Sequence, residues 1–247
     1  MINLEVCANS LASALAAQEG GAIRVELCDN LNEGGTTPSY GQILLARKML
    51  DIKLYPLIRP REGDFLYTDL EFEIMRADVK HCIEAGCDGI VIGILNADGS
   101  IDKQRCHELV HMAKLRGLGV TFHRAFDMCA DMNQALEDII EIGCERILTS
   151  GGKSTAIEGA NIIAHLIEKA KGRIIIMPGS GIDETTAADI VHFTKATEIH
   201  SSAREKVKSK MQYQNDHIIL SVEYHDEYSI KLTDAQKVRE IIRLANR

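Results

Sequence analysis

The sequence predicts an α/β fold, a single-domain TIM-like (β/α)8 barrel that spans residues 1–247. Short apolar runs rich in β-branched residues alternate with longer amphipathic segments, and there are eight of each. The 247 residues then divide into steps of about 31, which is the size of a strand–helix–strand unit. A length near 250 residues is also routine for an α/β barrel that forms one domain.

The elements follow one another in regular order. Strands are predicted near residues 2–7, 23–28, 53–59, 89–94, 119–124, 146–150, 173–178 and 197–201. Helices are predicted near residues 10–19, 40–50, 69–85, 102–116, 131–142, 155–170, 183–194 and 234–245, the last with Thr233 or Asp234 as its N-cap. The one long connection, 201–232, carries Met211, Tyr213, Tyr224 and Tyr228, and we expect it over the carboxyl ends of the strands.

A repeated junction supports closure of the strands into a barrel. Residues 19–26, 84–91 and 141–148 each place a glycine between a helix end and the next strand. These glycines, Gly21, Gly86 and Gly143, are 65 and 57 residues apart, or two strand–helix units in each case. Such a period suits eightfold closure, while a doubly wound open sheet is the alternative.

Composition narrows the class of protein. Lys plus Arg number 28 and Asp plus Glu number 36, so the net charge of −8 argues against nucleic-acid binding. We see no signal peptide and no apolar stretch of the roughly 20 residues that cross a bilayer, so no membrane partner is expected. Seven cysteines, an odd number, indicate reduced thiols in a cytoplasmic protein. The sequence carries no nucleotide or flavin fingerprint.

Strand alternation places unusual residues inside the predicted barrel. The apolar residues of each strand should meet the helices, which turns Glu5, Glu26, Arg59, His123 and His200 toward the barrel axis. Barrel interiors are normally filled by branched apolar side chains. Buried charges must pair or bind something. The set therefore predicts either a structural ion-pair network or a functional site.

The exit of the third strand carries two arginines around a proline. Arg59 and Arg61, held by Pro60, suit a forked clamp on a carboxylate or phosphate. The sequence therefore predicts an anion-binding group at this exit.

The exit of the fifth strand combines an imidazole, a cation and a carboxylate. His123, Arg124 and Asp127 lie within one turn, a set that moves a proton at neutral pH. In this hypothesis His123 is the acid or base, and Glu26 or Asp127 orients it.

Glycine-rich turns follow the sixth and seventh strands. Ser150 and Gly151 end one strand, and Gly179 and Gly181 end the next. Their backbone amides predict a cradle for an anion, as barrel phosphate sites after strand seven often provide. The alternative is that the glycines only form tight turns.

Two segments resemble known motifs, a P-loop and a zinc-protease helix, but each departs from its motif. Gly152-Lys153-Ser154 lacks the earlier glycine of a P-loop. His107, Glu108 and His111 match a zinc-protease helix, but they fall beside the apolar stripe of an outer helix and have no third ligand.

Cys7 and Cys28 each follow a glutamate by two residues at the ends of neighbouring parallel strands. Their thiols converge if the strand register pairs Glu5 with Glu26. Two thiolates favour a soft ion such as copper(I). The alternative is a pair of small residues that fill the top of the barrel.

Several long strings resemble the copper homeostasis family CutC, and the resemblance covers essentially the whole chain. They are RVELC (24–28), EGGTTPS (33–39), IRPREGDF (58–65), TFHRAFDM (121–128), LTSG (148–151) and HSSA (200–203). The resemblance implies a TIM-like barrel, a cytoplasmic homo-oligomer and a role in copper handling, with Cys7 and Cys28 as copper(I) ligands. It carries the family's site over to Glu26, Arg59, Arg61, Asp64, His123, Arg124, Asp127 and His200, and Cys129 also follows the motif.

Two functions therefore compete. The first is a copper-binding homeostasis protein that uses Cys7 and Cys28. The second is an enzyme acting on a small anionic metabolite, whose reaction the sequence does not assign. Arginines and histidines gathered in one mouth favour the second, and the resemblance favours the first. Both hold if copper sensitivity is an indirect result of lost metabolism.

Overall fold

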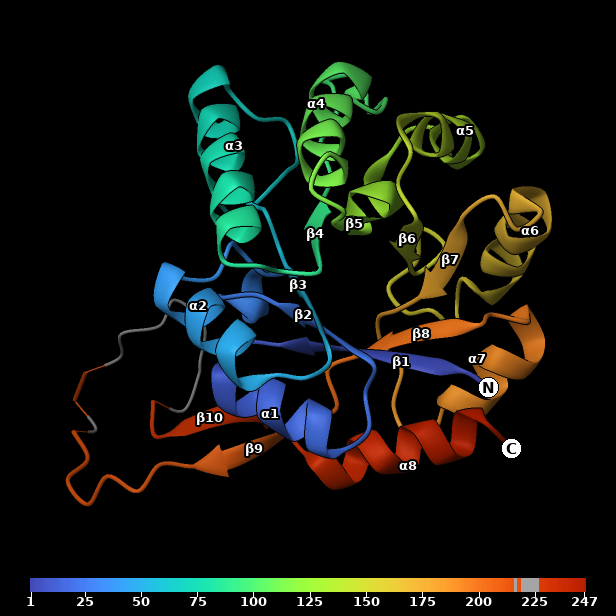
Figure 1. Cartoon of the computed structure of the whole chain (residues 1–247). Helices are drawn as coiled ribbons and strands as arrows, with labels where there is room; N and C mark the ends of the chain where they lie inside the picture. Colours follow the sequence, from blue (N-terminus) through green and yellow to red (C-terminus); the bar gives the residue numbers. More distant parts are fainter. Residues whose placement is uncertain (216, 219–226) are drawn as a thin grey trace.

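The computed structural model describes residues 1–215, 217–218 and 227–247. Within them, eight parallel strands lie at the centre of the molecule, with helices around them (Figure 1). The strands are β1 (Asn3–Ala8), β2 (Arg24–Leu27), β3 (Lys53–Pro56), β4 (Gly89–Ile92), β5 (Gly119–Phe122), β6 (Arg146–Thr149), β7 (Ile175–Pro178) and β8 (Glu198–Ser201). Each falls where the alternation of apolar runs predicts it.

Eight α-helices of the described chain connect the strands. They are α1 (Leu11–Glu19), α2 (Tyr40–Met49), α3 (Asp69–Glu84), α4 (Lys103–Lys114), α5 (Met132–Ile142), α6 (Ala160–Ala170), α7 (Ala187–Thr194) and α8 (Ala235–Ala245). Most begin where a side chain accepts a backbone N–H, as Ser10, Thr68 and Asp131 do. Helices α6 and α7 start later than predicted because turns occupy the residues before them. Two short 3₁₀ helices, η1 (Leu31–Glu33) and η2 (Arg124–Met128), were not predicted. Among the described helices, none is both long and apolar enough to span a membrane.

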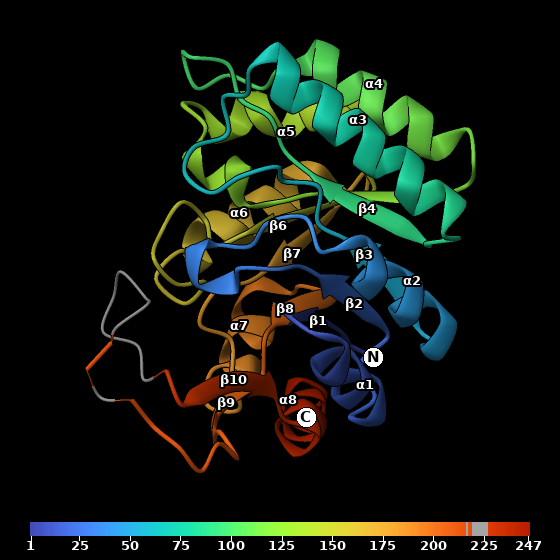
Figure 2. The same ribbon diagram turned by 90° about the vertical axis from the view of Figure 1, so that its left-hand side faces the viewer.

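The strands close on themselves. Two ladders run in the order β3-β2-β1-β8 and β4-β5-β6-β7. They join where Leu57 pairs with Val91 and the Ile58 N–H donates to the Val91 carbonyl at 2.8 Å. On the other side β7 lies beside β8 in both views (Figures 1 and 2). The barrel prediction is confirmed and the open doubly wound sheet is wrong. Gly21, Gly86 and Gly143 have the positive φ angles that the repeated junction predicts.

The barrel has two kinds of interior. Between strands and helices lies an apolar core, in which Val6, Val25 and Ile147 are fully buried. On the opposite faces of the same strands, Glu5 and Arg24 are also almost fully buried. The polar residues therefore face the barrel axis, as the alternation predicts.

The connection after β8 is not a simple loop, so that part of the prediction is wrong. Strands β9 (Arg204–Lys208) and β10 (Ser229–Thr233) pair antiparallel as a hairpin that lies beside α1 and α8 (Figures 1 and 2). The Thr233 N–H donates to the Ser13 hydroxyl at 3.1 Å, which ties β10 to α1. Asp234, not Thr233, caps α8. Tyr224 lies outside the described residues.

Candidate functional site

A closed network of charges fills the barrel where the strands begin. The Glu5 carboxylate contacts the Arg24 guanidinium and lies 2.8 Å from His200 Nδ1. Glu198 Oε2 lies 2.5 Å from Arg24 Nη2 and 2.8 Å from Arg146 Nε. All of these side chains are buried, so their charges are balanced inside the protein.

Tyr55 covers the network, and the network's acidic residue Glu5 is held in the charged form. The Tyr55 ring lies 5.3 Å from the Arg24 guanidinium, and its hydroxyl donates to Glu145 at 2.7 Å. Burial by itself would raise the pKa of Glu5, but Arg24 and the hydrogen bond with His200 hold that pKa well below its usual range. This half of the interior is therefore the structural ion-pair network that the sequence allowed.

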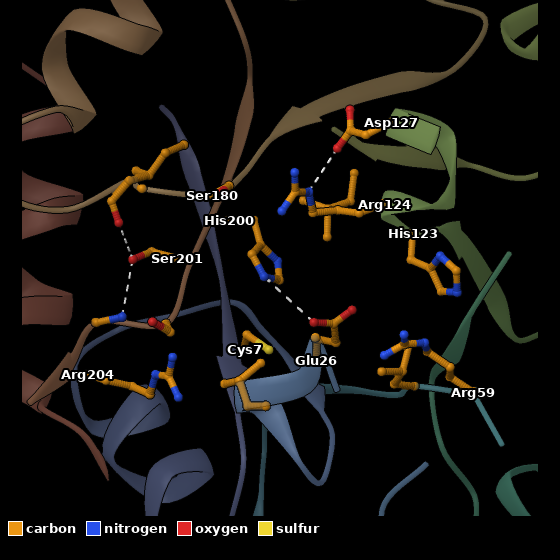
Figure 3. Close-up of a pocket in the computed structure, with 18 of the residues that line it drawn as sticks. Cys7, Glu26, Arg59, His123, Arg124, Asp127, Ser180, His200, Ser201 and Arg204 are labelled. Atoms are coloured by element: carbon orange, nitrogen blue, oxygen red, sulfur yellow. Dashed lines mark hydrogen bonds and ion pairs between the residues drawn. The ribbon is translucent and has the colours of Figure 1, made fainter. Parts of the chain in front are cut away.

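Above the network, at the carboxyl ends of the strands, a cavity of about 840 Å³ opens (Figure 3). Most of the predicted site residues line it. They are Cys7, Glu26, Arg59, Asp64, His123, Arg124, Asp127, Gly181 and His200. Cys28, Arg61, Ser150, Gly151 and Gly179 do not belong to its lining.

The floor of the cavity brings together three side chains of types that could hold a metal ion. Cys7 Sγ, a Glu26 carboxylate oxygen and a His200 ring nitrogen all lie within 4.8 Å of one another. Cys28 Sγ lies 3.6 Å from Cys7 Sγ. The register differs from the expected one, because Glu5 pairs with Arg24 and Cys7 with Glu26. The thiols still meet, since Cys28 follows the end of β2 and lies behind Cys7 in a buried cluster.

Burial governs the protonation of the floor. The pKa of the Cys7 thiol is raised well above its ordinary value by its hydrogen bond with Cys28 and by burial. Burial also raises the pKa of Glu26, although the nearby His200 opposes it. Burial would lower the pKa of His200, but its hydrogen bond with Glu5 and the charge of Glu26 raise it. Without a metal, Cys7 is therefore a neutral thiol, and metal binding must release its proton.

One wall of the cavity carries a buried arginine without a carboxylate partner. Arg59 Nη1 donates to the carbonyls of Glu33 (2.9 Å) and Gly35 (2.6 Å), and Nη2 donates to that of Gly63 (2.7 Å). Within the described part of the chain, its Nε–H has no acceptor and no carboxylate pairs with it. Arg59 is 5% exposed and lies 5.1 Å from the centre of the Phe65 ring, so carbonyl dipoles and an aromatic face surround its charge, but no carboxylate of the described chain neutralises it.

His123 stands next to Arg59 as a neutral donor. Its Nδ1 accepts the Ala125 N–H at 3.0 Å, which leaves the proton on Nε2, and Nε2 has no partner among residues that the structure describes. Burial and the charge of Arg59 lower the pKa of His123 to about 3. Without a ligand, His123 is therefore neutral at pH 7, and its proposed role in proton transfer stays a prediction. A Cβ on Gly93 would lie 2.4 Å from His123 Cε1, so this glycine makes room for the ring.

The predicted clamp of Arg59 and Arg61 does not form. Arg61 points away from the cavity and lies 2.6 Å from Glu71 and 3.0 Å from Asp64. Its side chain is 35% exposed, so this is an ordinary surface cluster. Arg59 and Arg61 do line a second, outer pocket of about 510 Å³ together, but there the Arg61 guanidinium is already taken by Glu71 and Asp64.

The amides after β6 hold an internal carboxylate, so they are not a cradle for a ligand. The Asp127 carboxylate accepts N–H groups from Ser150 (3.0 Å) and Gly152 (3.0 Å) and the hydroxyl of Thr149 (2.5 Å). Arg124 lies 2.8 Å from the same carboxylate. Asp127 therefore shapes this loop and does not orient His123. Gly151 serves the turn, since its N–H donates to Thr149 Oγ1 at 2.8 Å.

The two glycines after β7 differ in whether they line the cavity. Gly179 donates its N–H to the Thr149 carbonyl at 2.9 Å and so belongs to the sheet. Gly181 has a φ of 69° and lines the cavity.

Sequence reasoning did not single out several lining residues, and two of them are cations, Arg204 and Lys237. Arg204 comes directly after the HSSA string, so its position was a usable signal. Lys237 reaches the mouth from α8, and only the closed barrel brings it there. In the zinc-protease pattern, Glu108 pairs with Arg76 at 2.8 Å, with both side chains partly exposed.

Comparison with known proteins gives one consistent result. The sequence model described as the CutC family matches residues 2–205. A family protein CutC from Chromobacterium violaceum is 49% identical over 96% of both chains. The human copper homeostasis protein cutC homolog is 47% identical over 98% of this chain and 88% of its own.

Comparison with solved structures agrees with the family found by sequence. The crystal structure described as a copper homeostasis protein CutC from Streptococcus agalactiae superposes with a TM-score of 0.77 at 36% identity, covering 82% of this chain and 99% of that one. A phosphoribosylanthranilate isomerase from Thermotoga maritima covers all of this chain with a TM-score of 0.59 and 10% identity, over 99% of its own chain. The second likeness shows the barrel fold alone.

Proposed function

The chain belongs to the CutC family, and from this premise we propose that it binds copper(I) in the mouth of the barrel. The observation that carries the proposal is the pair of sulfurs, Cys7 Sγ and Cys28 Sγ, 3.6 Å apart beneath the cavity. Several relatives are named for copper homeostasis. In this function copper is cargo, and the protein acts in the cytoplasm as a homo-oligomer.

The donor set suits a soft ion. Thiolate sulfurs sit about 2.3 Å from a bound metal of this size, so two sulfurs 3.6 Å apart can share one ion. Soft thiolate ligands select copper(I) over harder ions. His200 and Glu26 lie against Cys7 and supply further ligands from the cavity side. Because Cys28 is fully buried, the ion must enter past Cys7.

The test is a copper(I) competition titration against a chromophoric chelator under anaerobic, reducing conditions. We expect Cys7→Ser and Cys28→Ser each to weaken copper(I) binding by about 100-fold, because each removes a thiolate ligand. The matched control is Cys129→Ser, which removes a half-buried thiol that does not line the cavity. Unchanged affinity in the double variant would overturn the proposal.

We propose a second function, the binding of a small anionic metabolite in the same cavity. The observation that favours it is Arg59, a buried cation without a carboxylate partner in the described chain, next to the unused Nε2–H of His123. A ligand anion would offset the cost of burying that charge. The volume of about 840 Å³ suits a small organic molecule and exceeds what one metal ion needs.

Native mass spectrometry of the protein as purified tests this second function. We expect a co-purifying anion that Arg59→Gln loses and Arg61→Gln retains. Arg61 is the matched control, because it is two residues away and outside the cavity lining. Retention of the same molecule by Arg59→Gln, or the absence of any bound molecule, would contradict an anion site at this wall.

A further inference from the structure

The rim of the cavity at the exits of β7 and β8 carries cations and backbone amides that neither proposed function has used. We propose that this rim binds the phosphate group of a phosphate monoester. The inference deepens the second proposed function and rests on it. The residues concerned are Gly181, Ile182, Ser202, Arg204 and Lys237, all of which line the cavity.

Two cations supply the charge. Arg204 is half-buried, and across the described chain no carboxylate lies within ion-pair distance of it. Figure 3 shows its guanidinium turned toward the cavity, on the side opposite Arg59 and His123. Lys237 Nζ lies 3.7 Å from Glu184 in a loose, partly exposed pair that a phosphate can replace.

Backbone amides supply directed donors. In the part of the chain that the structure describes, the N–H groups of Gly181, Ile182 and Ser202 donate to no acceptor. Successive amides in such a turn form a concave anion site. The conformation that presents them is unusual, since Ser180 has a φ of 80° and Gly181 a φ of 69°.

The two exits are fastened to each other. The Ser201 hydroxyl donates to the Ile182 carbonyl at 2.5 Å and accepts the Ala203 N–H at 3.2 Å. Ala203 has a φ of 44°, in the left-handed region that a non-glycine residue rarely adopts. This bond holds the β7 and β8 exits at a fixed separation, so donors from both can meet one ligand group.

At the neighbouring β6 exit, the backbone amides are occupied by a carboxylate of the protein itself, and the rim has no such internal anion among the described residues. There the amides of Ser150 and Gly152 hold the Asp127 carboxylate, which is an internal anion. The rim has two acidic residues of its own. The Asp183 carboxylate accepts N–H groups from Thr185 and Thr186 just before α7. Glu184 lies 3.7 Å from Lys237. No side-chain anion of the described chain therefore takes the rim amides.

The number and direction of the donors favour phosphate over carboxylate. Arg204 supplies one charge that no carboxylate of the described chain pairs, Lys237 adds a second that Glu184 only loosely offsets, and the amides come from two separate turns, those after β7 and β8. A tetrahedral phosphate accepts from several directions at once, while a carboxylate accepts within one plane. The rest of the ligand would then lie over Glu26 and toward Arg59 (Figure 3).

The experiment is calorimetric titration of the metal-free protein with ribose 5-phosphate, with ribose and with inorganic phosphate. We expect ribose 5-phosphate and inorganic phosphate to bind and ribose not to bind. Arg204→Gln should weaken both phosphate probes about tenfold or more, and Lys237→Gln should weaken them less. The matched control is Lys208→Gln, an exposed cation on the same strand as Arg204 that lies outside the cavity lining.

The outcomes separate this inference from the function on which it rests. If the phosphate probes bind equally to Arg204→Gln and wild type but lose affinity in Arg59→Gln, the rim assignment is overturned and an anion site at Arg59 stands. If neither probe binds at millimolar concentration, the phosphate proposal fails. The co-purified molecule then still decides the second function. Equal melting temperatures of the variants exclude misfolding as the cause of any loss.

Discussion

The two halves of the barrel interior treat buried charge in opposite ways. Where the strands begin, Arg24 meets two carboxylates, those of Glu5 and Glu198. Where the strands end, Arg59 is buried to a similar degree, but within the described chain it meets backbone carbonyls and the Phe65 ring and no carboxylate. Burial and residue type are the same in the two halves, so only the pairing distinguishes them. A buried charge that the protein pairs for itself is structural, whereas one left uncompensated beside a cavity points to a ligand.

The largest expected effect comes from breaking the paired half. Arg24→Met should lower the free energy of unfolding by about 3–5 kcal/mol, because Glu5 and Glu198 each lose a buried partner. Denaturation in urea measures this loss. Arg204→Met, at the mouth, is the comparison variant and should cost no more than about 0.5 kcal/mol, as is usual for surface substitutions. Similar losses for the two variants would remove the distinction between the two halves.

The pH dependence of stability probes the unpaired half. His123 has a pKa of about 3 in the folded protein and about 6.5 when unfolded. Between these values the unfolded chain binds more protons, so stability falls as pH falls through this window. From pH 7 to pH 5 the contribution of His123 should amount to about 2 kcal/mol.

His123→Gln isolates that contribution. The variant cannot take up the proton, so its unfolding free energy should fall less than that of the wild type between pH 7 and pH 5. His200 also titrates, but it is present in both the wild type and the variant, so its contribution to the pH dependence cancels when the two are compared. Parallel stability curves for wild type and variant would mean that His123 takes up its proton at the same pKa in the folded and unfolded states, which would contradict the lowered pKa described above.

The sequence predicts where the polar side chains of the site lie better than it predicts which groups contact them. Strand alternation places Glu26, His123 and His200 inside the barrel, because a period of two needs no tertiary information. Their roles depend on which atoms meet them. Burial and the charge of Arg59 act together to lower the pKa of His123, and neither effect is visible in a strand pattern.

Register and loop geometry account for the remaining errors. The Cys7–Cys28 contact was expected from a Glu5–Glu26 register, and it forms in a different one. At the β6 exit, the glycine-rich turn is correctly located, yet it binds Asp127 from a separate loop. Partners far apart in sequence are set by how neighbouring strands stagger around the closed barrel.

The smallest expected effect separates Arg61 from Arg59. Arg61 also contacts carboxylates, those of Glu71 and Asp64, but its side chain is 35% exposed and solvent screens both contacts. Arg61→Gln should therefore shift the melting temperature by about 2 °C or less. Differential scanning calorimetry of Arg61→Gln beside Arg24→Met makes the measurement. A shift as large as that of Arg24→Met would mean that pairing stabilises this protein regardless of burial. The small shift expected here would show that pairing stabilises this protein appreciably only where the pair is also buried.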